Sequence, residues 1–349
     1  MKQVLVGLAL AMLTASSAGA APSVQVRKAW GPMGPPAGVV VDAAPRKDGS
    51  VLAASGNAVF SFDPAGQTLP VAEGGAAVLD PTGRTFGLQR DDAFQVFDGE
   101  GQPLGSLPAL PHSLFKLAPG GRAVYAPRVV VRREFGVVED ARLLRPDGTR
   151  LAEFPARGLD ISRLLADRFV YTLPDSLHAR SLDGTELWSA RVQVHKFETA
   201  GERTILVRRY VPGEVLHFER EKRLSEAKVE GVVWNLAISP DSRFSAATTR
   251  TTLSLFRDGK LTATLRLPLA YANSLDVSDR GEALVGGQDA KGAAAILLYD
   301  PQGTLLWRGS GGEDSSGYRP GVRFFPGGDR FLVIERQGLT AYDVSRSQP

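Results

Sequence analysis

The sequence contains no cysteine, only three methionines, four tryptophans and four histidines, and no marked excess of either charge. Without cysteine the chain has no disulfide, no thiol nucleophile, no thiolate-bound zinc or iron–sulfur cluster, and no N-terminal cysteine for lipid attachment. A net charge of +3 over 349 residues gives no basis for nucleic-acid binding. After the N-terminal segment, no stretch is apolar over the roughly 20 residues that a transmembrane helix requires.

The N-terminus has the pattern of a secretory signal peptide. Lys2 supplies a positive start, residues 4–15 form an apolar run rich in Leu and Ala, and Ala18-Gly19-Ala20 provides a small-x-small cleavage site. A membrane anchor is the alternative, but the apolar run is shorter than the roughly 20 residues of a membrane span. We expect cleavage after Ala20, export to the periplasm or out of the cell, and a mature domain over residues 21–349.

Glycine and proline are abundant, with 38 and 23 residues, and together they exceed their share of roughly 12% in average proteins. They recur in the turns of a repeated pattern. In this pattern an aromatic residue or Leu is followed by Asp, Gly and an apolar run, as in Phe62-Asp63-Pro64-Ala65-Gly66-Gln67-Thr68-Leu69. Asp can cap such a turn, and Gly permits the positive φ that it needs. The turn glycines are Gly66, Gly101, Gly148, Gly184, Gly259 and Gly303.

The spacing of these glycines indicates the size of the repeating unit. The intervals run from 35 to 47 residues, except for one of 75 that holds a degraded copy at Phe218-Glu219. The charged run over residues 219–230 could be a short helix, but the register of the repeat favours an outer strand and its turn. A last copy begins at Tyr342-Asp343. Eight copies of about 41 residues match four-stranded propeller blades, which run ~40–45 residues each.

A second class of turn alternates with the first, as in Leu79-Asp80-Pro81-Thr82-Gly83-Arg84. Each unit therefore reads strand, turn, strand, loop, strand, Asp-Gly turn, strand. The last unit stops after its third strand, at residues 339–344, and an orphan strand at residues 23–30 precedes the first unit. We predict an all-β, eight-bladed β-propeller of four-stranded antiparallel blades, closed by this N-terminal strand. Seven blades are the alternative, if region 111–160 or 190–230 forms no separate blade.

Two sets of residues resemble known propeller families. The segment Leu236-Ala237-Ile238-Ser239-Pro240-Asp241-Ser242-Arg243 resembles the inner-strand turn of WD-repeat and TolB-type propellers. Residues 183–188 and 299–307, which run from Asp through Gly to Trp188 and Trp307, resemble the tryptophan-docking repeat of quinoprotein-like propellers. The resemblance covers the mature chain as weak repeats. It implies either a pyrroloquinoline-quinone dehydrogenase or a scaffold, as in the propeller lipoproteins that assist outer-membrane protein assembly. The chain lacks the vicinal Cys pair of some of these dehydrogenases and the Cys needed for lipidation.

Propeller ligands usually bind where loops of several blades converge at a mouth of the central channel. We therefore take the polar and aromatic residues that enter the innermost strands as a candidate binding site. Aromatic and Arg side chains are the types that anchor binding. The alternative for each residue is that it caps its own loop or packs between blades. The candidate residues are Trp30, His112, Asp160, His195, Trp234, Asn235, Tyr271, Asn273, Tyr318 and Arg319.

Some of these residues also suggest metal binding. His112 and His195 could begin a metal site with Asp160 as a third ligand, although a credible site needs three or four supported ligands. Asn235 and Asn273 resemble the axial ligands of calcium-dependent lactonase propellers, but no Glu completes the set. The two remaining histidines, at positions 178 and 217, are expected on outer strands facing solvent. No Gly-x-Ser-x-Gly elbow is present for a serine hydrolase.

The sequence thus predicts an exported propeller that binds or scaffolds, with no catalytic residues, metal or cofactor. It would recognise a protein or a small envelope ligand at the channel mouth, would not bind nucleic acid, and would be a monomer. The alternative is a calcium- or quinone-dependent propeller enzyme, either a dehydrogenase or a lactonase. Such an enzyme would retain Ca²⁺ or pyrroloquinoline quinone (PQQ) stoichiometrically through purification, which metal analysis and an absorption spectrum would reveal.

Overall fold

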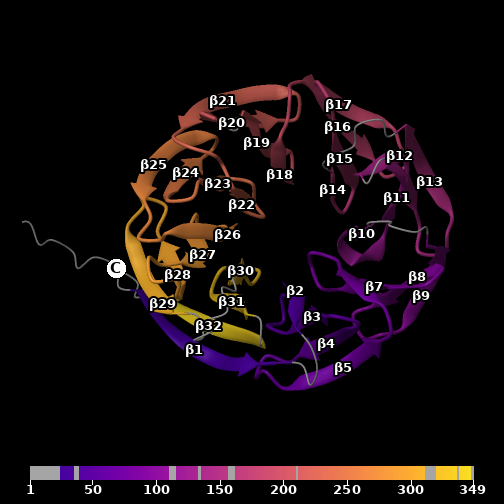
Figure 1. Cartoon of the computed structure of the whole chain (residues 1–349), viewed down its shortest axis with the longest axis horizontal. Coiled ribbons are helices and arrows are strands. Elements are labelled where there is room, and N and C mark those ends of the chain that lie inside the picture. The colour runs from indigo at the N-terminus through magenta and orange to yellow at the C-terminus, as the bar shows by residue number, and fades with distance from the viewer. Residues whose placement is uncertain are drawn as a thin grey trace, which may run out of the picture.

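The computed structural model describes residues 24–34, 39–109, 115–132, 135–155, 162–209, 211–310, 320–335 and 338–346. In these residues, 32 strands form eight four-stranded antiparallel sheets arranged as a ring around a common axis (Figure 1). The one helix in these ranges is a single 3-10 turn, η1 (Pro119–Gly121). The prediction of eight blades is confirmed, and the seven-blade alternative is wrong.

Each sheet is one blade, and successive strands run from the axis of the ring to its rim. The strands of blades 1 to 4, from innermost to outermost, are β2 (Val40–Pro45), β3 (Val51–Ser55), β4 (Ala58–Phe62) and β5 (Thr68–Glu73); β6 (Ala76–Leu79), β7 (Thr85–Arg90), β8 (Ala93–Asp98) and β9 (Pro103–Pro108); β10 (Lys116–Leu117), β11 (Val124–Arg132), β12 (Phe135–Leu144) and β13 (Arg150–Pro155); and β14 (Ser162–Leu164), β15 (Arg168–Leu173), β16 (Ser176–Ser181) and β17 (Glu186–Arg191). The strands of blades 5 to 8 are β18 (Lys196–Ala200), β19 (Arg203–Arg209), β20 (Gly213–Glu219) and β21 (Lys222–Val229); β22 (Asn235–Ile238), β23 (Phe244–Thr248), β24 (Thr252–Arg257) and β25 (Lys260–Arg266); β26 (Tyr271–Val277), β27 (Ala283–Gln288), β28 (Ala294–Tyr299) and β29 (Leu305–Ser310); and β30 (Gly321–Phe324), β31 (Arg330–Glu335), β32 (Gly338–Arg346) and β1 (Val24–Met33).

The Asp-Gly turns join the third and fourth strands of the blades, as the sequence predicts. In the turn after β4, one carboxylate oxygen of Asp63 accepts hydrogen bonds from the N–H groups of Ala65 at 2.9 Å and Gln67 at 2.8 Å. The φ angle of Gly66 is +87°, and all six turn glycines have φ between +76° and +91°. The charged run at residues 219–230 is a turn and an outer strand, β21, rather than a helix.

The same glycines form the contact between successive blades. A Cβ added to Gly66 of blade 1 would lie 2.8 Å from the ring of Trp30, on the outermost strand of blade 8. Each turn therefore packs its backbone on the outer part of the preceding blade. At five of the six glycines an added Cβ would lie 3.2 Å or less from that blade, which favours a residue without a side chain, whereas at Gly148 the distance is 3.6 Å. The equivalent contacts pair Gly101 with Val71, Gly148 with Leu107, Gly184 with Ala152, Gly259 with His217 and Ser225, and Gly303 with Leu265 and Ala263.

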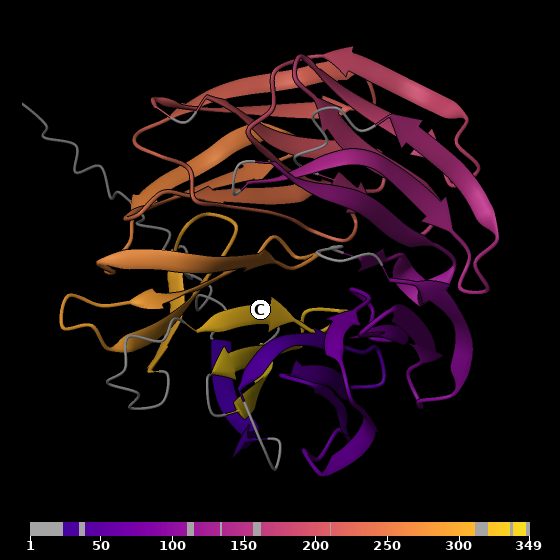
Figure 2. The same ribbon diagram turned by 45° about the vertical axis from the view of Figure 1, so that its right-hand side comes forward.

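Main-chain pairing of the two ends of the chain closes the ring. β1 pairs antiparallel with β32, from Val24 opposite Arg346 to Met33 opposite Leu339, and the indigo and yellow strands lie side by side in both views (Figures 1 and 2). This pairing confirms that the N-terminal strand supplies the missing fourth strand of the last blade. It gives blade 8 its fourth strand and covers the edge of β32 that would otherwise be unpaired.

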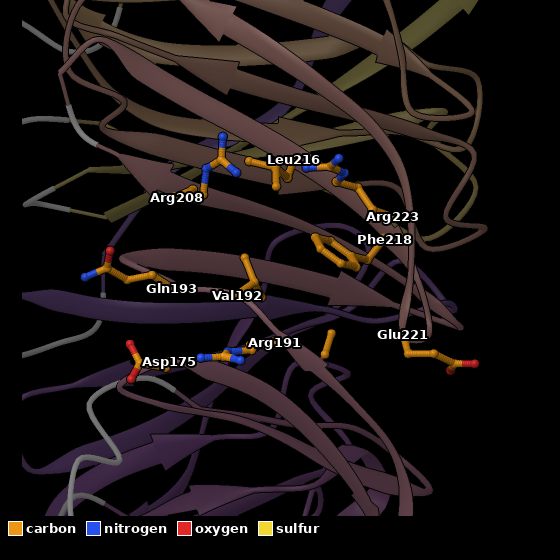
Figure 3. Close-up of a pocket in the computed structure, with 10 residues that line it drawn as sticks. Asp175, Arg191, Val192, Gln193, Arg208, Leu216, Phe218, Glu221 and Arg223 are labelled. Atoms are coloured by element: carbon orange, nitrogen blue, oxygen red, sulfur yellow. The ribbon is translucent and has the colours of Figure 1, made fainter.

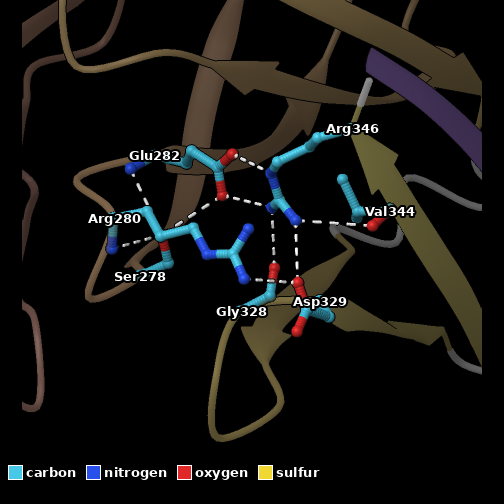
Figure 4. A network of polar contacts seen from close by, with 7 residues as sticks. All are labelled: Ser278, Arg280, Glu282, Gly328, Asp329, Val344 and Arg346. Atoms are coloured by element: carbon cyan, nitrogen blue, oxygen red, sulfur yellow. Dashed lines mark hydrogen bonds and ion pairs between the residues drawn. The ribbon is translucent and has the colours of Figure 1, made fainter. Parts of the chain in front are cut away.

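An ionic network beside this closure joins blades 7 and 8 (Figure 4). Arg346, at the end of β32, donates two hydrogen bonds to the carboxylate of Glu282, at 2.7 and 2.6 Å, and one to Asp329 at 2.9 Å. The Glu282 side chain, in the turn that leads into β27, is only 6% exposed, whereas that of Asp329 is 68% exposed. A bidentate pair of this kind fixes the geometry of both groups, and removing one partner leaves the other charge buried.

We expect Arg346→Ala to lower the free energy of unfolding by about 3 kcal/mol, because Glu282 would stay buried without its counter-charge. Arg280→Ala is the matched control, because it removes a 2.7 Å pair with the exposed carboxylate of Asp329 and should cost less than about 1 kcal/mol. Urea unfolding of both variants measures the difference. Equal losses would show that the Glu282 pair does not support the closure.

Candidate functional site at the two mouths of the ring

The direction of the inner strands determines which residues lie at each end of the axis of the ring. Adjacent inner strands are parallel, since Ser274 and Asp276 of β26 accept hydrogen bonds from the N–H groups of Val322 and Phe324 of β30, in that order. Residues that enter the inner strands therefore lie at one end of the ring, which we name the entry mouth. Residues that follow the inner strands lie at the other end, the exit mouth.

An aromatic cluster stands at the entry mouth. Trp234 directly precedes β22 and Tyr271 begins β26, so that blades 6 and 7 bring the two ring centroids to 6.1 Å. Trp234 is 46% exposed, and Lys196 of blade 5 donates a hydrogen bond to its carbonyl at 2.6 Å. The guanidinium of Arg250 lies 6.0 Å from the centre of the Tyr271 ring and donates to the carbonyl of Ala270 at 3.0 Å. Two of the predicted residues thus meet from neighbouring blades.

Arg250 is absent from the residues that the sequence predicts for this site. It lies in the turn between β23 and β24, which reaches the same face as the segments that enter the inner strands. The sequence repeat identifies equivalent positions only in the segments that lead into the inner strands. A turn between the second and third strands has no repeated motif in this chain, and so no sequence signal places Arg250 at the mouth.

The two predicted asparagines connect neighbouring blades. Asn235 donates through Nδ2 to the hydroxyl of Thr248 at 3.0 Å and to the carbonyl of Ala272 at 3.4 Å. Asn273 donates through Nδ2 to the carbonyl of Pro320 at 3.3 Å. Each amide therefore binds the backbone of the next blade, the packing role that is the alternative to ligand binding.

Charged side chains connect the inner strands of blades 3, 4 and 5 in the same way. Lys116 of β10 donates from Nζ to the carbonyl and the hydroxyl of Ser162, both at 2.9 Å. Arg163 of β14 binds Glu198 of β18 with two hydrogen bonds, of which the Nε bond measures 2.8 Å. Burial, followed by the charge of Arg163, lowers the pKa of Lys116 to about 8. These contacts hold the inner strands in register around the axis.

Two other predicted site residues lie among the described ones, His195 and Trp30. His195 directly precedes β18, and its N–H donates to the carbonyl of Val207 in its own blade at 2.8 Å. Trp30 lies on the outermost strand β1, is 6% exposed, and stacks on Phe62 at 6.0 Å. It packs blade 8 on blade 1, so its assignment to the mouth is corrected. The other four, His112, Asp160, Tyr318 and Arg319, lie outside the described residues and stay predictions.

The structure also corrects the expectation that His178 and His217 face solvent. His217 of β20 is 5% exposed, and its Nε2 lies 2.8 Å from the hydroxyl of Ser245 on blade 6. The side chain of His178 on β16 is 16% exposed and stacks on Tyr171 at 5.3 Å. Both histidines sit on third strands, whose two faces are covered by the neighbouring blades.

A pocket of about 870 Å³ opens at the exit mouth. It is lined by the turns that join the first and second strands of blades 1, 2, 6, 7 and 8, and by the hairpin between β8 and β9 of blade 2. Pro81, Pro240 and Pro326 contribute apolar surface, and charged residues of both signs also line the pocket, among them Lys47 and Asp279. These turns are the second turn class of the sequence. The repeat is sufficient to predict that these turns converge, whereas the predicted site residues lie at the opposite ends of the same strands.

Metal-binding clusters and membrane-spanning helices can be assessed for the described residues only. Among them, no group of three or more His, Cys, Asp or Glu side chains is placed to hold a metal ion. Within the same residues, no helix is long and apolar enough to cross a membrane. The predicted signal peptide lies outside them.

Comparison with known proteins supports the fold. No protein-family model and no curated protein matches the sequence. Among solved structures, the chain is similar to the C-terminal WD40 domain of Sif2, with a TM-score of 0.60, 11% identity, and coverage of 89% of this chain and 96% of that one. It is also similar to BamB from Moraxella catarrhalis, with a TM-score of 0.58, 13% identity, and coverage of 86% of this chain and 96% of that one. The computationally designed Ika8 protein is similar as well, with a TM-score of 0.64, 14% identity, and coverage of 88% of this chain and 96% of that one. The chain therefore shares the β-propeller fold of WD40 domains.

We expect His217 to make the protein less stable in acid. Burial, followed by the charge of Arg203, lowers its pKa from the ordinary 6.5 to about 4. Between these values the unfolded chain binds more protons than the folded one, so stability falls as pH drops through this interval. The loss between pH 7 and pH 5 is about 2 kcal/mol. Urea unfolding of His217→Gln should show a pH dependence smaller by that amount, and an unchanged dependence would refute this role.

Proposed function

We propose that this protein is an exported propeller that binds a protein partner through its entry mouth and acts as a scaffold rather than an enzyme. The observation that carries the proposal is Trp234, which is 46% exposed yet held against Tyr271 of the next blade, beside Arg250. Tryptophan, tyrosine and arginine are the residues that contribute most to binding hot spots in protein interfaces. Large exposed aromatic surface of this kind is otherwise buried in a folded protein.

The backbone around Trp234 supports a preformed binding surface. Its N–H donates to the carbonyl of Thr248 at 2.7 Å, and its carbonyl accepts a hydrogen bond from Lys196. The residue is therefore held by its own blade and by the preceding one. Fixing an anchor residue before binding lowers the entropic cost of association. The likeness of the fold to WD40 domains and to BamB is consistent with a binding role.

We also propose that the chain is exported after cleavage at Ala20, that it is a monomer without a resident cofactor, and that it is related to the quinoprotein-like propellers. The N-terminal sequence pattern supports export. The close packing of Trp30 on Gly66 supports the relationship, because it pairs a tryptophan of one blade with the turn glycine of the next.

Site-specific photo-crosslinking tests the binding surface. Benzoylphenylalanine in place of Trp234 should give a discrete crosslinked partner in the cells that produce the protein. The same residue in place of Leu69, which is 62% exposed on the outermost strand of blade 1, should not give this product, because Leu69 lies on the rim and not at the mouth.

Competition makes this experiment specific. Added wild-type protein should suppress the crosslink, whereas Trp234→Ala protein should not, because it lacks the aromatic anchor. The unfolding midpoint of Trp234→Ala should stay close to that of the wild type, since the side chain lies largely outside the core. The same products from both positions, or none from position 234, would contradict the proposal.

A further inference from the structure

One hairpin departs from the glycine contact that joins the other blades. Seven hairpins connect third to fourth strands within blades, and six of them place a glycine against the preceding blade. The seventh, between β20 and β21 of blade 5, contains Arg220 and Glu221 instead. Glu221 occupies the place that Gly259 has in the two-residue hairpin of blade 6. This hairpin is the degraded copy of the sequence repeat.

A groove of about 570 Å³ lies between blades 4 and 5, beside this hairpin (Figure 3). Glu221 is one of the residues that line it. A side chain at this position prevents the close backbone approach that glycine allows in the other six turns. Because the turn of blade 5 cannot pack its backbone on the outer strand of blade 4, space is left between the two blades at the rim.

Three apolar side chains lie at the floor of this blade 4–5 groove, whose accessible lining is otherwise mainly polar. Val192, Leu216 and Phe218 line it, and all three belong to the buried cluster that joins the two blades. Trp188 of the outer strand β17 belongs to the same cluster and is 8% exposed. An apolar side chain that enters the groove would therefore extend an existing core and would be removed from water.

The rim of the groove is rich in arginine. Arg191, Arg208 and Arg223 line it, against the two carboxylates of Asp175 and Glu221. Figure 3 shows Arg191 and Asp175 on the blade 4 side, and Arg208 and Arg223 on the opposite side. Arginine side chains thus lie on both sides of the floor.

Two of these arginines already have carboxylate partners. Arg208 binds Glu214 at 2.7 Å and Glu226 at 2.9 Å, and Arg223 binds Glu226 at 3.2 Å. Arg191 is exposed, and no carboxylate among the described residues pairs with it. Its guanidinium can therefore take a carboxylate from another molecule in a bidentate pair.

We propose that the blade 4–5 groove binds an extended peptide segment of a partner protein in which acidic and apolar side chains alternate. Alternate side chains of an extended chain point to opposite sides, so the apolar ones would pack on the floor while an acidic one reaches Arg191. The neighbouring strand β17 is the outermost of its sheet and pairs only with β16 in the described structure. Its free edge offers backbone groups to an extended chain. This surface is separate from the entry mouth and does not depend on Trp234.

A fluorescein-labelled decapeptide of alternating Glu and Leu tests the proposal, with a Lys and Leu decapeptide as the charge control. Fluorescence anisotropy should show saturable binding of the acidic peptide and no comparable binding of the basic one. Arg191→Glu should weaken binding by at least about tenfold, which corresponds to ~1.4 kcal/mol. Arg27→Glu, a matched change at an exposed arginine on the outermost strand of blade 8, should leave the affinity unchanged. Unfolding curves check that both variants fold.

Tryptophan emission locates the peptide independently of affinity. Binding of the unlabelled acidic peptide should shift the emission of the wild-type protein, and Trp188→Phe should abolish the shift, since Trp188 belongs to the cluster beneath the groove. The absence of saturable binding, equal binding of the two peptides, wild-type affinity of Arg191→Glu, or persistence of the shift in Trp188→Phe overturns the proposal. Loss of peptide binding in Trp234→Ala would place the peptide at the entry mouth and would overturn it as well.

Discussion

The packing of a turn glycine on the outer strand of the preceding blade is the contact on which the rest of this structure depends. One residue meets two requirements there, because the hairpin needs a positive φ and the adjacent blade needs a backbone without a side chain. The contact brings successive blades close together at six of the eight junctions. At the junction of the two chain ends it takes the form of Trp30 on Gly66, which docks the closing strand while β1 pairs with β32. A chain without disulfides is closed in this way.

One proposed binding surface lies where the glycine contact between blades is missing, and the other lies where an aromatic side chain is exposed at the start of an inner strand. Glu221 replaces the glycine at the junction of blades 4 and 5, and a groove opens beside it. Trp234 stands at an inner-strand entrance with nearly half its surface exposed, although the other three tryptophans lie mainly against neighbouring blades. A rigid ring holds both features in fixed positions, which favours specific binding because little order must be created when a partner arrives.

The fold could be predicted from the sequence because it depends on local turn chemistry. Asp63 and Gly66 identify a hairpin without any knowledge of the tertiary structure, and counting such hairpins gives the blades. The candidate binding site is harder to predict from the sequence than the fold. In a propeller both faces of each sheet are covered by neighbours, so alternation along a strand does not tell which side chain meets solvent. The sequence therefore predicts His217 on a solvent-facing position, whereas it is buried, and predicts Trp30 at the mouth, whereas it packs between blades 8 and 1. Trp234 and Tyr271 were found because their positions are fixed by the start of an inner strand.

A double-mutant cycle between Gly66 and Trp30 tests the central contact most directly. Gly292→Ala is the reference, because Gly292 has φ +81° in a similar Asp-capped turn and an added Cβ would meet nothing within 4 Å. Gly66→Ala should lower the free energy of unfolding by about 1–3 kcal/mol more than Gly292→Ala, because its Cβ would overlap the Trp30 ring. In a Trp30→Ala background this excess should disappear. An excess that is the same in both backgrounds would contradict the account.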